Sequence, residues 1–180
     1  MPVKSASLAA GILGIALAGC ATRPASGPAN VHAGSPGEPA PGAAAATPGT
    51  DRAAAMIRSA TAMLGQPYRF GGAGPGGFDC SGLVSFAAQS AGLHVPRTAS
   101  EQLRSGVRIA RAEIMAGDLV FMRLSHKQLH VGIAIGGGRF IHAPAAGSRV
   151  RIDSLAAHPY SSGFIEARRV IGADTRVSGL

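Results

Sequence analysis

The sequence predicts an α+β domain in which helices come first and an antiparallel β-sheet follows. From residue 51 to residue 106, apolar side chains recur at the helical period of about 3.6 residues, and a glycine ends each run. After Gly117 the period changes to two, which is typical of half-buried strands. Because the helices precede the strands, we expect N-terminal helices packed on a C-terminal antiparallel sheet.

Three helices are expected, each ended by a glycine. The first has Asp51 as its N-cap and carries an apolar stripe that includes Ile57 and Leu64. In the third, Thr98 and Glu101 have the spacing of a capping box. The expected ranges are 51–64, 80–91 and 96–106.

Five strands are expected after these helices, joined as an antiparallel meander. The second and third form a hairpin, because the triple glycine at 136–138 separates two runs of alternating side chains. The expected ranges are 118–122, 130–135, 139–142, 150–152 and 164–170.

The first residues of the chain indicate export. Lys4 precedes an apolar run at 8–18, which is short for a bilayer span and typical of a secretory signal. The run ends in Leu17-Ala18-Gly19-Cys20, which resembles the lipobox of bacterial lipoproteins. The resemblance implies that residues 1–19 are a signal peptide, that Cys20 is acylated, and that several acyl chains anchor the protein to a membrane.

Ala21, rather than aspartate, follows the cysteine, which implies an address at the outer membrane, facing the periplasm. A simple signal peptide cut nearby is the alternative, and the chain is exported in both cases. Residues 20–50 hold the lipidated cysteine and a linker, since positions 21–50 contain 9 Ala, 6 Pro and 5 Gly and almost no large apolar side chain. The folded domain then covers 51–172, and 173–180 form a loose tail.

The chain carries a net charge of +8, from 17 Lys and Arg against 9 Asp and Glu. Lys4 supplies +1 and residues 21–50 cancel, so +7 belongs to residues 51–180. Such a surplus suits nucleic acid, anionic lipid or an acidic polymer. Since export separates the protein from DNA, we expect no nucleic-acid partner.

Cys80 stands alone once Cys20 is lipidated, in a compartment where structural cysteines usually occur in pairs. The glycine-rich stretch at 71–77 delivers it to the start of the second expected helix. There the partial positive charge of the helix N-terminus would lower the pKa of the thiol. We therefore expect an activated nucleophile, with a buried structural cysteine as the alternative.

Two histidines have the spacing needed to serve that thiol. His130 opens one strand of the expected hairpin and His142 closes the other, so the two are expected close to opposite each other. Their rings would then hydrogen-bond, one acting as base and the other orienting it. Spacing alone thus gives Cys80, His130 and His142 as a candidate catalytic triad.

A further pattern lies in six short segments between residues 67 and 144. They are Pro67-Tyr68-Arg69-Phe70-Gly71-Gly72, Phe78-Asp79-Cys80-Ser81-Gly82-Leu83, Pro96-Arg97-Thr98, Gly117-Asp118-Leu119-Val120-Phe121, His130-Val131-Gly132-Ile133 and Phe140-Ile141-His142-Ala143-Pro144. In order and spacing these segments resemble the NlpC-type family of papain-like cell-wall cysteine peptidases, over about residues 55–171. The resemblance implies a papain-like α+β fold with Cys80 as nucleophile, His130 as general base and His142 as the polar third member.

The resemblance also implies roles for neighbouring side chains. Tyr68 would lie beside the nucleophile and help to hold the oxyanion or the substrate. Asp79 and Ser81 would line the pocket on the acyl side of the scissile bond, which in relatives that cut non-crosslinked stem peptides grips a free L-alanine amine. Phe70 and Met122 stand where relatives often carry other aromatic residues, and we expect both to be core residues.

The reaction implied by the family is hydrolysis of the bond between γ-D-glutamyl and a diamino acid in peptidoglycan stem peptides. These stems are rich in carboxylates, which suits a basic domain. Peptidoglycan and, through the lipid anchor, a membrane are therefore the expected partners. We expect no cofactor and no metal, and the sequence identifies no regulatory protein partner.

Three alternatives remain open. One cysteine and two histidines can hold a catalytic zinc ion, with His126 as a further ligand, although an extended segment would separate His126 from His130 by roughly 13 Å, at about 3.3 Å per residue. A non-catalytic scaffold could keep the fold and bind peptidoglycan without cutting it. Related folds also transfer acyl groups with the same Cys and His, but no lipid-length apolar segment lies near the expected site.

Overall fold

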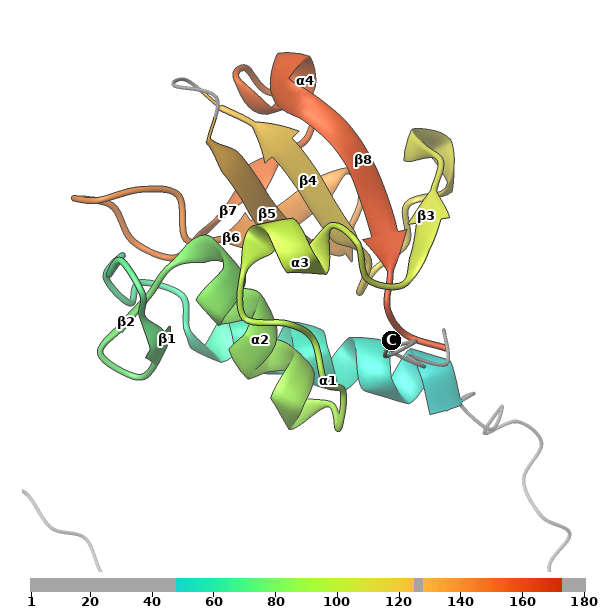
Figure 1. Cartoon of the computed structure of the whole chain (residues 1–180), viewed down its shortest axis with the longest axis horizontal. Helices are drawn as coiled ribbons and strands as arrows, with labels where there is room; N and C mark the ends of the chain where they lie inside the picture. The colour runs from blue at the N-terminus through green and yellow to red at the C-terminus, as the bar shows by residue number, and fades with distance from the viewer. Residues whose placement is uncertain (1–47, 125–127, 173–180) are drawn as a thin grey trace, which may run out of the picture. The chain divides into compact units, whose positions relative to one another are not determined.

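The computed structural model describes residues 48–124 and 128–172 (Figure 1). The expected signal peptide, the lipidation site Cys20, the linker as far as residue 47 and the tail at 173–180 lie outside the described residues, as does His126. Across the ranges that the structure describes, no helix is both long enough and apolar enough to span a membrane.

Helices precede the main sheet along the chain, which confirms the α+β class (Figure 1). Five short elements, of two to four residues each, were not predicted, because they are too brief to show a period. They are β1, β2, β3, η1 and α4 in the order that follows. In chain order the elements are α1 (Pro48–Ala62), β1 (Ala73–Gly74), β2 (Gly77–Phe78), α2 (Cys80–Ser90), α3 (Ala99–Gln102), β3 (Val107–Ile109), the 3₁₀ turn η1 (Arg111–Glu113), β4 (Leu119–Arg123), β5 (Leu129–Gly136), β6 (Arg139–His142), β7 (Arg151–Ser154), α4 (Tyr160–Gly163) and β8 (Phe164–Arg169).

The larger sheet has the strand order β3-β8-β4-β5-β6-β7, and all its pairings are antiparallel. Strands β4 to β7 are neighbours in chain order, as a meander requires. The last strand, β8, departs from a meander because it returns to pair with both β3 and β4. Helices α1 and α2 lie side by side on one side of this sheet (Figure 1).

Buried side chains cover both faces of the sheet. On the helical face, Met56 of α1 and Leu83 of α2 belong to one cluster with Ile133 of β5. On the opposite face, a smaller cluster contains Met122 of β4 and Phe140 of β6. Met122 is therefore a core residue, as predicted. Burial of β5 between two apolar layers stabilises the strand that carries His130.

Helix α1 begins earlier than predicted, and the assignment of Asp51 as its N-cap is wrong. Pro48 opens the helix, since the fixed φ and missing N–H of proline suit a first turn. Asp51 follows inside that turn, where its charge still complements the helix N-terminus. The helix ends at Ala62, so Leu64 lies beyond it and is 41% exposed. Met56 is fully buried in its place.

The other predicted helices follow their local signals. Helix α2 begins at Cys80, as expected. Before α3, Thr98 and Glu101 form both halves of the predicted capping box. Helix α3 is shorter than predicted, since it ends four residues before Gly106, whose φ of +68° suits glycine.

The hairpin of β5 and β6 turns at the predicted glycines, but its register differs from the prediction. Ile133 pairs with Ile141, and a bulge shifts the register near the turn. Continuing this pairing by one residue sets Gly132, and not His130, opposite His142. His130 lies two residues before Gly132 in β5 and on the same face, so the two histidines are diagonal neighbours.

Candidate active site

Cys80 lies where the glycine-rich loop meets the first turn of α2. The loop is tied to the helix by the N–H of Asp79, which donates to the carbonyl of Gly72 at 2.9 Å. Gly82 permits this approach, because a Cβ at that position would collide with the same carbonyl oxygen. Sequence and packing therefore hold the thiol at a fixed place at the helix N-terminus.

The Cys80 thiol is partly buried and unpaired, and burial raises its pKa above the ordinary value. The backbone N–H of Val131 hydrogen-bonds the sulfur and acts in the opposite direction, while the charge of Asp79 raises the pKa further. The backbone N–H groups of Cys80 and Ser81 at the helix N-terminus also act to lower this pKa, but desolvation outweighs them, so the expected net lowering is wrong. The resting thiol keeps its proton and needs a base when it attacks.

His130 and His142 present adjacent imidazoles on the neighbouring strands β5 and β6. His130 Nε2 lies 2.7 Å from His142 Nδ1, and the two rings are nearly perpendicular at an interplanar angle of 80°. The expected contact is present, although it is diagonal. Gly132 makes room for it, since a Cβ there would lie 3.2 Å from the Cβ of His142 and 2.6 Å from Cδ2 of Phe140.

Asp153 on strand β7 continues this contact into a line across three strands. His142 Nε2 lies 2.9 Å from Asp153 Oδ2. The same oxygen accepts hydrogen bonds from the Tyr160 hydroxyl at 2.7 Å and from Arg151 Nε at 2.8 Å. No role for Asp153, Tyr160 or Arg151 was predicted from the sequence. The pairing of β6 with β7 brings Asp153 and Arg151 to the histidines, Tyr160 comes from α4, and no spacing within the chain signals that arrangement.

Burial and hydrogen bonding set the charges along this line. Burial lowers the pKa of His130 from 6.5 to about 3, and its neighbour His142 adds to the shift. Burial likewise lowers the pKa of His142 to about 4, against the opposing hydrogen bond to Asp153. Burial acts to raise the pKa of Asp153, but hydrogen bonds from Tyr160, Arg151 and His142 hold it at about 2. At neutral pH both imidazoles are therefore uncharged and Asp153 is ionised.

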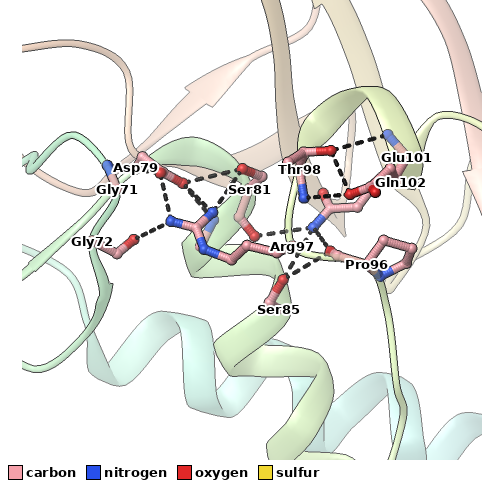
Figure 2. A network of polar contacts seen from close by, with 11 residues as sticks. Gly71, Gly72, Asp79, Ser81, Ser85, Pro96, Arg97, Thr98, Glu101 and Gln102 are labelled. Atoms are coloured by element: carbon pink, nitrogen blue, oxygen red, sulfur yellow. Dashed lines mark hydrogen bonds and ion pairs between the residues drawn. The ribbon is translucent and has the colours of Figure 1, made fainter.

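On the other side of Cys80, Asp79 is paired with Arg97 (Figure 2). Arg97 Nη2 lies 2.7 Å from Oδ2 of Asp79, and Nη1 lies 3.0 Å from Oδ1. Arg97 Nη1 also donates to Ser81 Oγ at 3.1 Å. Asp79 at the same time caps α2, because its Oδ1 accepts the N–H of Gly82 at 2.6 Å. Asp79 and Ser81 thus lie beside Cys80, as expected from the resemblance. The carboxylate of Asp79 is already paired with Arg97 and with the N–H of Gly82.

The Asp79–Arg97 pair is ionised and close to neutral as a whole. Burial acts to raise the pKa of Asp79, yet the hydrogen bonds from Arg97, Gly82 and Ser81 hold it below 3.8. The turn that carries Arg97 is fixed by the buried amide of Gln102, which donates to the carbonyl of Pro96 at 2.8 Å (Figure 2). The sequence signal for Arg97 was its place in the Pro96-Arg97-Thr98 segment, to which no function was assigned.

A cleft of about 470 Å³ contains Cys80 and His130. Tyr68 lines it, and burial together with the charges of Cys80 and Asp79 raises the pKa of its hydroxyl, which therefore stays a hydrogen-bond donor at neutral pH. Phe70 also lines the cleft and is 91% exposed, so the expectation that it is a core residue is wrong. An exposed aromatic ring beside the nucleophile is positioned to contact substrate.

The polar groups do not form a metal-binding set. Among residues 48–124 and 128–172, no three His, Cys, Asp or Glu side chains are placed to hold one ion. The facing nitrogens of His130 and His142 hydrogen-bond each other, and the second nitrogen of His142 contacts Asp153. The arrangement is suited to orient and move protons between a thiol and an imidazole.

Comparisons with known proteins agree with this geometry. The chain is 41% identical over 119 residues to the murein DD-endopeptidase MepH of Escherichia coli, which covers 63% of this chain and 44% of that protein. It is 37% identical over 120 residues to a probable endopeptidase of Corynebacterium glutamicum, covering 67% of this chain and 56% of that protein. The chain thus spans about half the length of these relatives.

Solved structures of NlpC/P60 proteins are similar to this chain in fold. An NlpC/P60 protein from Bacillus cereus superposes with a TM-score of 0.63 at 34% identity, covering 66% of this chain and 40% of that one. The NlpC/P60 domain of the peptidoglycan hydrolase SagA superposes with a TM-score of 0.56 at 34% identity, covering 65% of this chain and 97% of that domain. These likenesses confirm the expected NlpC-type, papain-like fold. Residues 65–169 match the model of the NlpC/P60 family, and the chain belongs to that family.

Proposed function

We propose that the protein is a peptidoglycan hydrolase, a cysteine endopeptidase that cuts stem peptides with Cys80 as nucleophile. The observation that supports it most is the 2.7 Å contact of His130 Nε2 with His142 Nδ1, made by a histidine that lines the same cleft as Cys80. Membership of the NlpC/P60 family and the endopeptidase names of relatives support the same reaction class.

The proposed reaction has two steps. His130 takes the proton of Cys80 as the sulfur attacks the scissile carbonyl, and the backbone N–H of Cys80 with the Tyr68 hydroxyl stabilises the oxyanion. The C–N bond then breaks, His130 returns the proton to the leaving amine, and a thioester remains. His130 next activates a water that attacks the thioester, which releases a carboxylate product and restores the thiol. His142 orients His130 throughout.

Two bonds are candidates for cleavage. The family resemblance favours the bond between γ-D-glutamyl and the diamino acid. The name of the E. coli relative, a DD-endopeptidase at 41% identity, favours instead a cross-link bond between two D-centres. The pairing of Asp79 with Arg97 supports the second candidate, because a carboxylate held by a guanidinium is not available to grip a free stem-peptide amine.

The localisation of the protein is a separate proposal. We propose that Cys20 is acylated and holds the catalytic domain at the outer membrane, facing the periplasm, with residues 21–47, which precede α1, as the tether. Radiolabelled palmitate should enter the wild-type protein and not Cys20→Ala. Label that persists in the variant would contradict the anchor.

Digestion of purified sacculi tests the reaction. The wild type should release soluble fragments, and mass spectrometry of the new ends should identify the bond that was cut. Cys80→Ala should release none, whereas His94→Ala, which removes an exposed histidine near the end of α2, should behave as wild type. Equal release by the wild type and Cys80→Ala would overturn the proposal, and binding without release would favour a scaffold. A chelator that abolishes release while a thiol-alkylating agent does not would favour zinc.

A further inference from the structure

Asp153 ends the line of hydrogen bonds that begins at His130, and its charge determines where each hydrogen lies. An ionised carboxylate only accepts, so the hydrogen in the 2.9 Å contact with Asp153 belongs to His142 Nε2. A neutral imidazole with its hydrogen on Nε2 has a lone pair on Nδ1. His142 Nδ1 therefore accepts the 2.7 Å hydrogen bond from His130 Nε2. His130 is left with its lone pair on Nδ1.

We propose that Asp153 is a positioning residue, which acts through His142 to hold His130 in the tautomer that can accept the proton of Cys80. The inference rests on the proposed function of Cys80 and His130 as nucleophile and base. Once His130 has taken that proton it is a buried cation, and the ionised Asp153 supplies the opposite charge along the same line.

The structure holds Asp153 firmly in this role. Tyr160 and Arg151 both donate to its Oδ2, and Arg151 Nη2 donates in turn to the Tyr160 hydroxyl at 3.1 Å. The Tyr160 ring stands edge-on to His142, with centroids 5.3 Å apart. The pairing of His142 with Arg151 in β6 and β7 sets this geometry. An oxygen with three donors has little freedom to turn away from the imidazole.

Tyr160 and Arg151 donate to Asp153 and also face His142, since the Tyr160 ring lies against its imidazole and Arg151 pairs with it across the strands. Cys80, Asp79 and Tyr68 line the cleft at the His130 end. A change at Asp153 should therefore reach Cys80 through the two imidazoles and not through a second direct contact.

Asp153→Leu tests the tautomers at a similar side-chain size. It removes the acceptor of His142 Nε2 and leaves Arg151, which can only donate, beside that nitrogen, so the hydrogens of both rings should move to Nδ1. Asparagine is not suitable, because its amide oxygen would keep the hydrogen bonds from Arg151, Tyr160 and His142. In Asp153→Leu, His130 would present an N–H to Cys80 where it needs a lone pair. In a Ser-His-Asp triad, an imidazole in the wrong tautomer lowers kcat about 10⁴-fold.

Three measurements on the full chain define the outcome. Nitrogen-15 NMR of the imidazoles should show Nε2–H tautomers in the wild type and Nδ1–H tautomers in Asp153→Leu. Alkylation of Cys80 by iodoacetamide at neutral pH, followed by peptide mass spectrometry, should slow about tenfold or more. On peptidoglycan, kcat should fall about 10³- to 10⁴-fold while KM changes less than about threefold.

Two further variants separate positioning from folding. Tyr160→Phe keeps the charge of Asp153 and should retain the wild-type tautomers with only a several-fold loss of kcat, about the effect of one hydrogen bond. Asp51→Asn removes an exposed carboxylate on α1 and should change none of the three measurements. Circular dichroism establishes that each variant is folded.

The outcomes are distinct from those for the proposed function. Unchanged tautomers in a folded Asp153→Leu overturn the proposal, as does a kcat within about twofold of wild type. Reversed tautomers and slowed alkylation support it even if the wild type cuts no peptidoglycan, in which case only the proposed function fails.

Discussion

The two polar networks beside Cys80 differ in burial. The line from His130 to Asp153 crosses the sheet and passes through a fully buried His142, whereas the Arg97 side chain in the other network is 41% exposed. Hydrogen bonds in a buried line strengthen one another and tolerate no unpaired member. An exposed ion pair contributes only about 0–1 kcal/mol. The buried network is therefore suited to hold protons at fixed atoms, and the exposed one to adjust to what enters the cleft.

Acid should break the buried network before the exposed one. The pKa values of His130 and His142 are lowered to about 3 and about 4, so below pH 6.5 the unfolded chain binds more protons than the folded chain. The stability contributed by the two neutral imidazoles is complete above pH 6.5 and is lost as the pH falls toward 4. The loss should be about 1.4 kcal/mol per pH unit for each histidine.

Denaturant unfolding between pH 7 and about 4.5 measures this slope, above the range in which Asp79 and Asp153 lose their charges. His142→Gln serves as the internal control and should remove about half of the slope. A free energy of unfolding that stays flat below pH 6.5 in the wild type would contradict the lowered pKa values.

Gly132→Ala should disturb the buried network by crowding it. The added Cβ would lie 2.6 Å from Phe140 and 3.2 Å from His142, closer than packed side chains allow. We expect a loss of about 1–3 kcal/mol of stability, as for other overpacked cores, together with loss of activity. Gly74→Ala is the matched control, because its Cβ meets no atom within 4 Å. Equal changes in the unfolding temperature of the two variants would show that the contacts at Gly132 do not destabilise the protein.

Asp79 variants should separate the two roles of one carboxylate. Asp79→Ala removes the N-cap of α2 and the partner of Arg97, and should cost about 1 kcal/mol of stability. Asp79→Asn removes only the charge, since asparagine is a good N-cap, and should cost less. Chemical denaturation of both variants measures the difference. Equal losses would mean that the ion pair, and not the cap, stabilises the helix start.

Arg97→Gln should have the smallest effect on stability and should change substrate preference. It frees the carboxylate of Asp79, so peptides with a free N-terminal amine should be cut several-fold faster relative to their N-acetylated forms. Arg104→Gln removes an exposed arginine of the same region and should leave the ratio unchanged. Competition between the two peptide forms, followed by mass spectrometry, gives the ratio. An unchanged ratio in Arg97→Gln would show that the pair does not set specificity.

Structural features that depend on a few residues close together in the sequence were predictable. Cys80 is the first residue of its helix, Thr98 and Glu101 form their capping box, and the triple glycine turns the hairpin. Each depends on a few neighbouring side chains, so tertiary packing had little chance to override it. The contact between His130 and His142 was predictable for the same reason, because a short hairpin joins them.

Features that depend on distant pairing were not predictable. The register of the hairpin, with Ile133 opposite Ile141, sets His130 diagonal to His142 and not opposite it. Asp153 reaches His142 only through the register of β6 with β7. Phe70 was expected in the core because it stands where relatives often carry other aromatic residues, yet it is exposed at the cleft. The pKa of Cys80 follows from burial, which a helix start alone does not reveal.

The line from His130 to Asp153 takes one member from each of three consecutive strands. His130 therefore becomes an oriented base only when β5, β6 and β7 have paired in register, because no single segment of the chain holds all three residues. During refolding, the reactivity of Cys80 should reach its native value only when the last of these strands docks. Stopped-flow alkylation compared with the recovery of circular dichroism would show this delay. During export, an unfolded chain would then carry a Cys80 thiol of ordinary reactivity, and catalysis would start only after the domain has folded.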